Sequence, residues 1–477
     1  MNFTMIRNWV GMVESKAFYD ACDKYGILIY DDFWLANPSD GTIPKDDERF
    51  IRTAQEKIKK VRNHPSLAIY CGRNEGNPPD SLKDALADAC EDLDGTRIYI
   101  PASNSGPTTG NGPYGTQDPK QYFLSTKIFK LHTEMGLMNI PTYESLVDMF
   151  TEDYLWPIND VWGMHDFTQS HAANFAYLNR IDLYGKAKTI KDFERKAQLV
   201  SYESHKAMFE AMAIREDVGL LMWMSNPAWP STVWQTYDHY LDINGGYAGV
   251  KKACERLHIL MNAANETVYV VNKTRVAYSG ANSLTYEVKV YNMDGTLMAS
   301  YGGFNVLAAV DSIIDTEYII PFSSIVGLSD VHFVVLKLSD RDGTVLSTNY
   351  YWRAKNSTGS GNIWYADYAQ FNDMETAEFS GSAKMETIDD RTKLTATITN
   401  TNGKAAVMVR FKVVQNGSGE RILPVCYSDE YFLMLPGESK VVSMDYATSD
   451  AFGNEPQLFV EGFNVERTEI RLEKDGG

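Results

Sequence analysis

The stretch RNHPSLAIYCGRNE, residues 62–75, is the part of the sequence that decides the fold. It places a short apolar run, residues 67–70, between a polar segment that contains Pro65 and an Asn-Glu pair. This pattern predicts a buried strand that carries Glu75 at its far end. Because an Asn-Glu pair is common by chance, the prediction depends on the whole stretch.

A second stretch has the same form. The segment FKLHTEMG, residues 129–136, is a short strand-like run that carries Glu134 near its end. Glycosidases use a pair of carboxyl groups, one on each side of the bond that is cleaved. Two strands that each carry a glutamate at one end therefore predict Glu75 and Glu134 as a candidate catalytic pair.

Composition excludes several classes of protein. The chain has 477 residues, of which 63 are acidic and 45 basic, so its formal net charge is −18 and a nucleic-acid backbone would be repelled. No run reaches the ~18 apolar residues of a membrane span. Aromatic residues make up 12% of the chain and suit both protein cores and the apolar faces of sugars.

The five cysteines are far apart and show no CxxC spacing, which predicts reduced thiols. Neither a disulfide framework, nor a metal site, nor a cofactor is expected. The first residues, MNFTMIRNWVG, lack the long apolar centre of a secretory leader and are typical of the middle of a fold.

Residues 1–262 alternate strand-like runs with helical patterns, which predicts a parallel sheet covered by helices. Besides the two stretches above, the expected strands cover residues 5–9, 27–33, 97–102 and 219–225. The expected helices cover residues 14–25, 46–63, 81–93 and 190–212. Residues 103–119 are rich in Gly, Pro, Ser, Thr and Asn, and predict a long binding loop.

After residue 266 the pattern changes to strict alternation, as in LTYEVKVY at residues 284–291. Asp-Gly pairs at residues 294–295 and 342–343 predict hairpin turns. We expect one β-sandwich over residues 266–355, a Ser-Gly linker at residues 356–362, and a second all-β unit over residues 362–477.

The chain resembles glycoside hydrolase family two, in the branch nearest to exo-β-D-glucosaminidases and β-mannosidases. The matching stretches are MIRNW (5–9), FYDACDKYGILIYDDF (18–33), residues 62–75, GPY (112–114), HTEMGLMNIP (132–141), WGMHDF (162–167) and YFLMLPGES (431–439). The resemblance implies a multidomain chain with a (β/α)₈ TIM-type barrel followed by two immunoglobulin-like β-sandwich domains.

The resemblance also implies roles for four residues. Glu75 corresponds to the general acid/base and Glu134 to the nucleophile of a retaining double displacement. In such enzymes the two carboxyl groups lie about 5–5.5 Å apart. Asn74 would bind the substituent at carbon 2 of the sugar, and Trp223 would line the pocket.

Further residues are candidates for the pocket wall, with a structural ion pair or packing role as the alternative. These candidates are Arg7, Trp9, Asp32 and Trp34 at the ends of early strands, and His165 in the WGMHDF segment. His132 lies two residues before Glu134 on the same strand face, and a buried structural role is expected for it.

The sequence leaves the sugar open. Some members of the glucosaminidase branch have Ser-Asp where this chain has Asn74-Glu75. A terminal β-glucosaminide, β-mannoside or β-galactoside therefore remains a candidate substrate, within an oligosaccharide or a simple glycoside. A periplasmic or secreted location is expected for the full-length parent protein.

The first matching motif, at residues 5–9, corresponds to the second barrel strand of the family. We therefore expect a truncated barrel that lacks its first strand, with self-association into a homo-oligomer as one way to cover the gap. A catalytically incompetent or merely carbohydrate-binding protein is the alternative to an active glycosidase. An unrelated α/β scaffold with chance motif matches is a third possibility.

Overall fold

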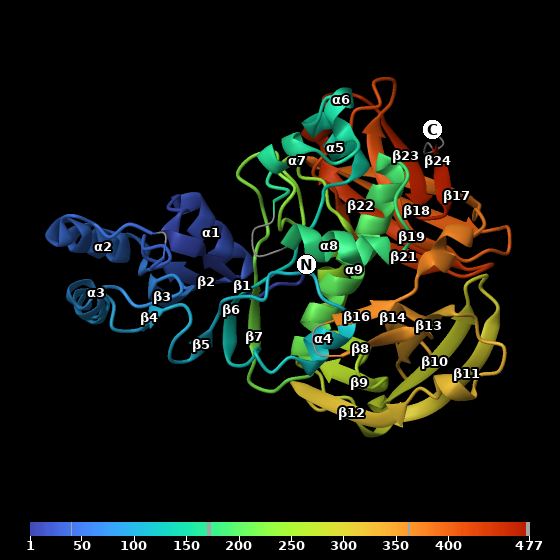
Figure 1. Cartoon of the computed structure of the whole chain (residues 1–477), viewed down its shortest axis with the longest axis horizontal. Coiled ribbons are helices and arrows are strands. Elements are labelled where there is room, and N and C mark those ends of the chain that lie inside the picture. The colour runs from blue at the N-terminus through green and yellow to red at the C-terminus, as the bar shows by residue number, and fades with distance from the viewer. Residues whose placement is uncertain (40, 169–172, 361–362, 474–477) are drawn as a thin grey trace.

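The computed structural model describes residues 1–39, 41–168, 173–360 and 363–473. An N-terminal α/β unit is followed by two all-β units (Figure 1). The strands of the α/β unit are β1 (Met5–Asn8), β2 (Leu28–Asp32), β3 (Leu67–Arg73), β4 (Ile98–Ala102), β5 (Thr108–Thr109), β6 (Leu131–Met135) and β7 (Gly219–Met222). Its helices are α1 (Lys16–Tyr25), α2 (Asp47–Val61), α3 (Asp80–Leu93), α4 (Pro119–Leu124), α5 (Tyr143–Met149), α6 (Glu152–Leu155), α7 (Asp160–Met164), α8 (Ala173–Asp182), α9 (Ile190–Ala213) and α10 (Gly245–Ala253).

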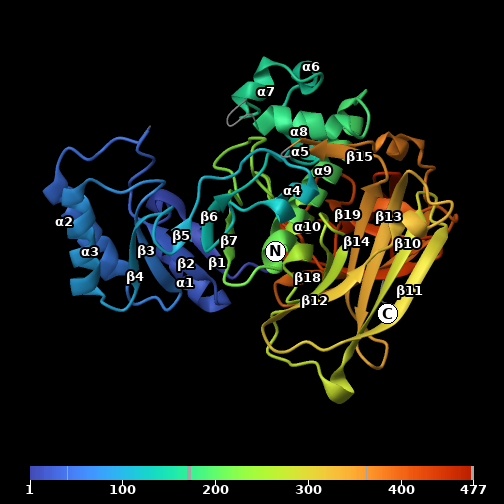
Figure 2. The ribbon, with the colours of Figure 1, turned by 60° about the horizontal axis from the view of Figure 1, so that its bottom comes forward.

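The strands of the α/β unit are parallel and form two sheets. Strands β1 to β4 are hydrogen-bonded in chain order, as are β5 to β7, and β1 lies beside β7 (Figures 1 and 2). Met5, Tyr30, Cys71, Ile100 and Leu221, from five of these strands, pack in one small core. Because parallel strands end at the same edge, the side chains after β1, β2, β3 and β6 are brought together there.

Local sequence signals explain the helices that cover these strands. The Ser15 hydroxyl accepts the amide hydrogen of Phe18 at the start of α1, and Gly26, at φ 70°, ends that helix. The Asp46 carboxylate caps α2 in the same way. The helices expected at residues 14–25, 46–63, 81–93 and 190–212 are confirmed as α1, α2, α3 and α9.

The first β-sandwich has two sheets. One sheet contains β8 (Leu257–Met261), β9 (Thr267–Asn272) and β12 (Ser312–Ile319), and the other contains β10 (Leu284–Asn292), β11 (Leu297–Val306), β13 (Val331–Ser339) and β14 (Val345–Ala354). The alternation predicted for residues 284–291 is confirmed, because Leu284, Tyr286, Val288 and Val290 are all buried. Strand β8 precedes the expected start of this unit and pairs with β9.

The Ser-Gly segment does not form the expected open linker. Residues 357–360 form β15 (Ser357–Ser360), which pairs with β16 (Ile363–Ala366), while residues 361 and 362 lie outside the described ranges. Backbone hydrogen bonding in this hairpin overrides the flexible composition. The last unit contains β17 (Phe379–Ile388), β18 (Arg391–Asn400), β19 (Ala406–Gln415), β20 (Cys426–Tyr427), β21 (Phe432–Met434), β22 (Ser439–Ala447), β23 (Pro456–Gly462) and β24 (Val465–Glu473).

Helix α9 joins the three units. It has 24 residues, 19 of them buried, and it lies where the α/β unit meets both all-β units (Figure 1). Within the described ranges, no helix is long and apolar enough to cross a membrane. Within the α/β unit α9 packs against α10, α4 and α8, and part of its burial comes from contacts with the next unit, as where Lys206 donates hydrogen bonds to Asn349 and the Tyr350 carbonyl in β14.

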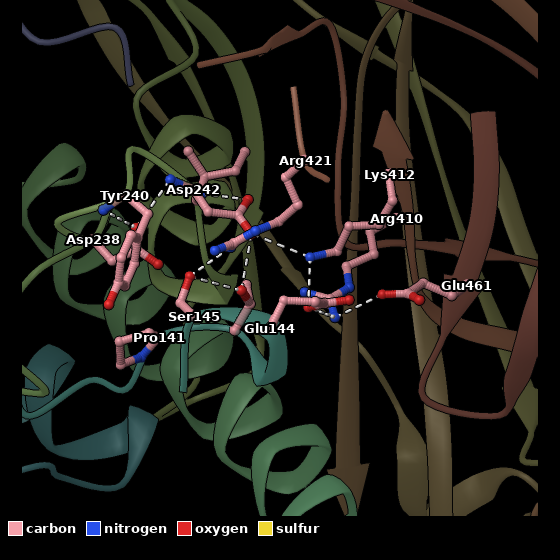
Figure 3. Close-up of polar contacts among 12 residues, drawn as sticks. Pro141, Glu144, Ser145, Asp238, Tyr240, Asp242, Arg410, Lys412, Arg421 and Glu461 are labelled. Carbon is pink, nitrogen blue, oxygen red and sulfur yellow. Dashed lines mark hydrogen bonds and ion pairs between the residues drawn. The ribbon is translucent and has the colours of Figure 1, made fainter. Parts of the chain in front are cut away.

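A buried ionic cluster connects the α/β unit to the last unit (Figure 3). Lys412 in β19 lies 2.8 Å from Glu144 in α5 and 3.1 Å from Asp242. Arg421 contacts the same Asp242 oxygen at 3.0 Å, and Arg410 pairs with Glu461 at 2.7 Å. Because buried charges are costly unless they are paired, this cluster ties the two units together in one arrangement.

Candidate active site

The two predicted carboxylates lie at the carboxyl ends of β3 and β6. Glu134 is in β6 and is buried, whereas Glu75 follows β3 by two residues and is half-buried. Glu75 has a φ of 51°, a backbone conformation that residues other than glycine rarely adopt. The Ser103 hydroxyl, after β4, accepts the amide hydrogen of Glu75 at 2.9 Å and so supports this turn.

The hydroxyl of Tyr114 lies between the two carboxyl groups. It is 3.0 Å from Oε1 of Glu75 and 2.6 Å from Oε2 of Glu134. One oxygen of each predicted carboxyl group therefore contacts the same tyrosine hydroxyl. A tyrosine hydroxyl has one proton to donate, so both contacts are satisfied when one of the two carboxyl groups is itself protonated and donates to the tyrosine oxygen.

The loop that carries Tyr114 is held by β6. The amide of Gly112 donates to the Glu134 carbonyl, the amide of Gly136 donates to the Pro113 carbonyl, and Nε2 of His132 lies 2.7 Å from the Gly112 carbonyl oxygen. His132 is buried and contacts Thr109 through Nδ1, as expected for a structural histidine. The same strand thus positions Glu134 and the loop that reaches over it.

Arg7 in β1 connects most of the polar groups of the site. Its guanidinium donates to Oε1 of Glu134 at 2.6 Å, to both carboxylate oxygens of Asp32 at 3.2 and 2.7 Å, and to Oδ1 of Asn74 at 2.7 Å. Asp32 also accepts the amide hydrogen of Val10. Arg7 therefore holds the carboxylate of Glu134 in place and offers it a positive charge.

Electrostatics of the site follow from burial and from these partners. Burial raises the pKa of Glu134 above its usual value, although Arg7 and Tyr114 oppose the rise. Burial would lower the pKa of Arg7, but the carboxylates of Asp32 and Glu134 outweigh it and raise that pKa. Burial and the neighbouring Glu134 raise the pKa of Tyr114, so its hydroxyl keeps its proton.

An amide chain links Arg7 to Glu75. Oδ1 of Asn74 accepts from Arg7, Nδ2 of Asn74 donates to Oδ1 of Asn37 at 2.6 Å, and Nδ2 of Asn37 donates to Oε2 of Glu75 at 2.7 Å. Ser103 adds a further contact to Asn74 at 3.3 Å. Every polar atom of the Glu75 carboxyl group thus has a protein partner.

The aromatic candidates divide into two groups. Trp9 follows β1 and packs edge-on against Trp223, which follows β7, with ring centroids 5.0 Å apart. Trp34 lies elsewhere, since it donates to Glu14 and packs against Phe50. For Trp9, Trp34 and Trp223, a role in binding sugar stays a prediction.

His165 also has contacts apart from the carboxylate pair. Its Nδ1 lies 2.8 Å from the Pro230 carbonyl oxygen, and its ring stacks on Trp229 and packs against Phe150. These contacts join the WGMHDF segment to the loop after β7. Its role in the site remains a prediction.

The sequence did not single out three residues that contact the candidate pair: Asn37, Ser103 and Tyr114. Tyr114 belongs to the GPY motif, which was the available signal for it. Asn37 lies in a polar loop after Asp31 and Asp32, and nothing local distinguishes it. Its importance depends on the loop path, which brings its amide to Glu75.

One possible group of metal ligands is present in the described part of the chain, and it lies away from the carboxylate pair. It consists of Asp20, Asp23 and His64. His64 and Asp23 already contact each other at 2.6 Å, and Lys16 pairs with Asp20 at 2.7 Å. These contacts give each of the three side chains a protein partner.

Comparisons with known proteins show what the chain is similar to. Residues 357–465 match the family model described as the exo-β-D-glucosaminidase Ig-fold domain. The exo-β-D-glucosaminidase of Amycolatopsis orientalis is 28% identical and is matched over 95% of this chain and 48% of its own length. The mannosylglycoprotein endo-β-mannosidase of Lilium longiflorum is 27% identical, with 97% of this chain and 60% of that protein covered.

A solved structure extends the similarity to the whole fold. The crystal structure of the Amycolatopsis orientalis exo-chitosanase CsxA superimposes with a TM-score of 0.89 at 25% identity, covering 98% of this chain and 60% of that chain. The fold is therefore that of a multidomain glycoside hydrolase with an immunoglobulin-like domain.

Together these findings confirm the resemblance to glycoside hydrolase family two, in the branch of exo-β-D-glucosaminidases and β-mannosidases. The chain spans about half the length of the first of these curated relatives.

Proposed function

We propose that this chain acts as a retaining exo-β-glycosidase, with Glu134 as nucleophile and Glu75 as general acid/base. The observation that carries the proposal is the Tyr114 hydroxyl, which contacts one oxygen of each carboxyl group. The relatives named as exo-β-D-glucosaminidases and a β-mannosidase support the choice of a glycoside as substrate.

The surroundings of the two carboxyl groups support this division of roles. Glu134 is buried and contacts the Arg7 cation at 2.6 Å, which favours the ionised form that a nucleophile needs. Glu75 is half-buried, and its Oε1 faces the Tyr114 hydroxyl on the side of Glu134, where a glycosidic oxygen would lie. Glu134 would attack the anomeric carbon while Glu75 protonates the departing oxygen, and Glu75 would then activate water.

The spacing favours retention of configuration. The two oxygens that face Tyr114 are separated by no more than the sum of their distances to its hydroxyl, 3.0 and 2.6 Å. These facing oxygens are thus closer than the ~6.5–9.5 Å over which inverting enzymes place their carboxyl groups. The space between Glu134 and the anomeric carbon is therefore too small for the water molecule that an inverting mechanism places there.

The remaining predictions fit within this proposal. The seven parallel strands of the described residues would form most of a (β/α)₈ barrel within residues 1–262, with sandwich units at 266–355 and 362–477. Asn74 keeps one amide hydrogen free of the contacts described above, and it would bind the substituent at carbon 2 of the sugar. Arg7 and Asp32 would form the base of the pocket, and Trp9 and Trp223 its wall.

A panel of aryl β-glycosides tests the proposal. β-Glucosaminides, β-mannosides and β-galactosides cover the sugars that the relatives suggest. We expect turnover of one of them to fall to background in Glu134→Gln and by roughly 10²–10⁴-fold in Glu75→Gln. Glu91→Gln, on the exposed side of α3, is the matched control and should keep full activity.

Proton NMR of the first product then decides the stereochemistry. The β-anomer should appear first if configuration is retained, and the α-anomer would contradict the double displacement. Binding of a sugar without turnover in the wild-type chain would support the carbohydrate-binding alternative. Full activity of Glu134→Gln would overturn the assignment of the nucleophile.

A further inference from the structure

Asn37 is the side chain that contacts the oxygen of Glu75 facing away from Glu134. Its Nδ2 donates to Oε2 of Glu75 at 2.7 Å, while Oε1 of Glu75 faces the Tyr114 hydroxyl. The two oxygens of Glu75 therefore have different partners. Only one of them lies on the side of the nucleophile, where a glycosidic oxygen would be protonated.

The orientation of the Asn37 amide follows from a chain of contacts that starts at Arg7. A guanidinium can only donate hydrogen bonds, so the Asn74 atom that contacts Arg7 at 2.7 Å must be the oxygen. Nδ2 of Asn74 must then face Asn37, and the Asn37 atom that it contacts at 2.6 Å must be an acceptor. The remaining amide atom of Asn37, its nitrogen, faces Glu75.

The backbone near Asn37 is held by the end of β3. Arg73 donates through Nε to the Ala36 carbonyl at 2.7 Å, and the Asn74 amide donates to the Leu35 carbonyl at 3.0 Å. The amide of Gly41 donates to the Asn37 carbonyl. The loop after β2 is thus fixed to the end of β3, so the backbone that carries Asn37 stays beside Glu75, and the contacts of the Asn37 amide with Asn74 and Glu75 set its orientation.

We propose that Asn37 is a positioning residue that keeps the catalytic proton of Glu75 on Oε1. The carbonyl oxygen of a neutral carboxylic acid is a stronger hydrogen-bond acceptor than its hydroxyl oxygen, so an amide N–H donor at one oxygen favours the proton on the other. With Oε2 occupied as an acceptor, the proton of the neutral acid resides on Oε1, on the side of Tyr114 and Glu134. Through Asn74 and Asn37, Arg7 thereby sets which oxygen of Glu75 carries the proton, and through its direct contact it favours the ionised form of Glu134.

This inference rests on the proposed function, and it predicts an effect that depends on the leaving group. Asn37→Leu keeps the size of the side chain and removes both of its hydrogen bonds. Hydrolysis of a phenyl β-glycoside, whose leaving group needs protonation, should fall by about 10–100-fold in kcat/KM. Hydrolysis of the 2,4-dinitrophenyl glycoside, whose leaving group needs no acid, should change by less than about threefold.

Asn37→Asp provides the second variant. It keeps the shape of the side chain but places an oxygen where Nδ2 donated, so Oε2 of Glu75 now competes for the proton. We expect the same selective loss on the phenyl substrate. Asn282→Leu, an exposed site in the first sandwich, is the control and should leave both substrates unaffected.

Equal losses on both substrates, or wild-type activity of Asn37→Asp, would overturn the inference while leaving the proposed function intact. Absence of turnover in the wild-type chain would instead count against the proposed function. Neutron diffraction gives a readout that needs no turnover. Deuterium on Oε1 of Glu75 in crystals at acidic pH supports the inference, and deuterium on Oε2 or on neither oxygen overturns it.

Discussion

At the scale of single residues, the candidate site depends on polar groups that lack access to bulk water. Arg7, Asp32 and Glu134 each have side chains no more than 5% exposed. In such surroundings each hydrogen bond has a larger effect than it would at the surface, and the loss of a partner leaves a buried charge without compensation.

Replacing Arg7 by methionine should destabilise the fold strongly. The change leaves Asp32 and Glu134 without their cation, and breaking a buried pair in this way costs about 3–5 kcal/mol. Urea unfolding of the α/β unit measures the loss. Lys16→Met is the matched control, because Lys16 and Asp20 also lie 2.7 Å apart but are exposed, and its effect should stay within about 1 kcal/mol. Similar losses in the two variants would contradict the importance of burial.

Removing the Tyr114 hydroxyl should affect both rate and pH dependence. The acidic limb of kcat/KM follows ionisation of the nucleophile, so the raised pKa of Glu134 should place that limb above the ~4.3 of a free glutamate. Because the Tyr114 hydrogen bond lowers this pKa, Tyr114→Phe should move the limb to higher pH and reduce kcat/KM by at least about tenfold. Tyr154→Phe, at an exposed tyrosine, is the control. An unchanged limb would contradict the assignment of Glu134.

At the scale of elements, the site is assembled where strand ends and loops approach closely. The strongest example is the contact between the end of β6 and the end of β7. A Cβ added to Gly136 would lie 1.7 Å from the carbonyl oxygen of Trp223. The absence of a side chain at Gly136 is therefore what allows the backbone of Trp223 to approach the end of β6, where its amide donates to the Met135 carbonyl.

Gly136→Ala should disturb this contact. The new methyl group meets backbone atoms, which cannot move as a side-chain end can, so we expect a loss of at least about 1–3 kcal/mol in stability together with reduced activity. Thermal unfolding and aryl glycoside turnover give the two readouts. Gly163→Ala in α7 is the matched control, because the added atom would meet nothing within 4 Å. Normal activity in Gly136→Ala would show that the position of Trp223 does not matter.

At the scale of the whole molecule, buried charges lie where the α/β unit meets the last unit. Glu194 in α9 is one of them, and its Oε1 has no hydrogen-bond partner among the described residues. The nearest cation is Arg410, at 3.8 Å. Burial, opposed by Arg410, raises the pKa of Glu194 to about 7.

This pKa predicts how stability changes with pH. Between about pH 4.5 and 7 the folded chain keeps a proton on Glu194 that the unfolded chain has released, so stability falls as pH rises through this window. Glu194→Gln mimics the neutral form and should be more stable than the wild type at pH 8, by up to about 3 kcal/mol. The difference should vanish near pH 4.5.

Urea midpoints measured from pH 4.5 to pH 8 test this expectation. Glu386→Gln, at an exposed position of β17, is the control and should follow the wild type throughout. A constant difference between Glu194→Gln and the wild type across the range would contradict the pH linkage.

The sequence by itself predicted the order of the main strands and of α1, α2, α3 and α9, and it singled out the two candidate carboxylates. Alternation along residues 284–291 and the caps at Ser15 and Asp46 act through neighbouring residues, so they could be recognised without the fold. Glu75 and Glu134 were identified because each lies near the end of a strand-like run. Parallel strands place such ends at the same edge of a sheet.

Only the tertiary structure decided which side chains surround these carboxylates. Arg7 and Glu134 are 127 positions apart, and Asn37 reaches Glu75 because Arg73 and Asn74 hold its loop. The Ser-Gly segment became a strand because a partner strand offered hydrogen bonds that its composition does not encode. Contacts of this kind depend on register and loop path, which are set by the packing of the whole chain and leave no local pattern to read.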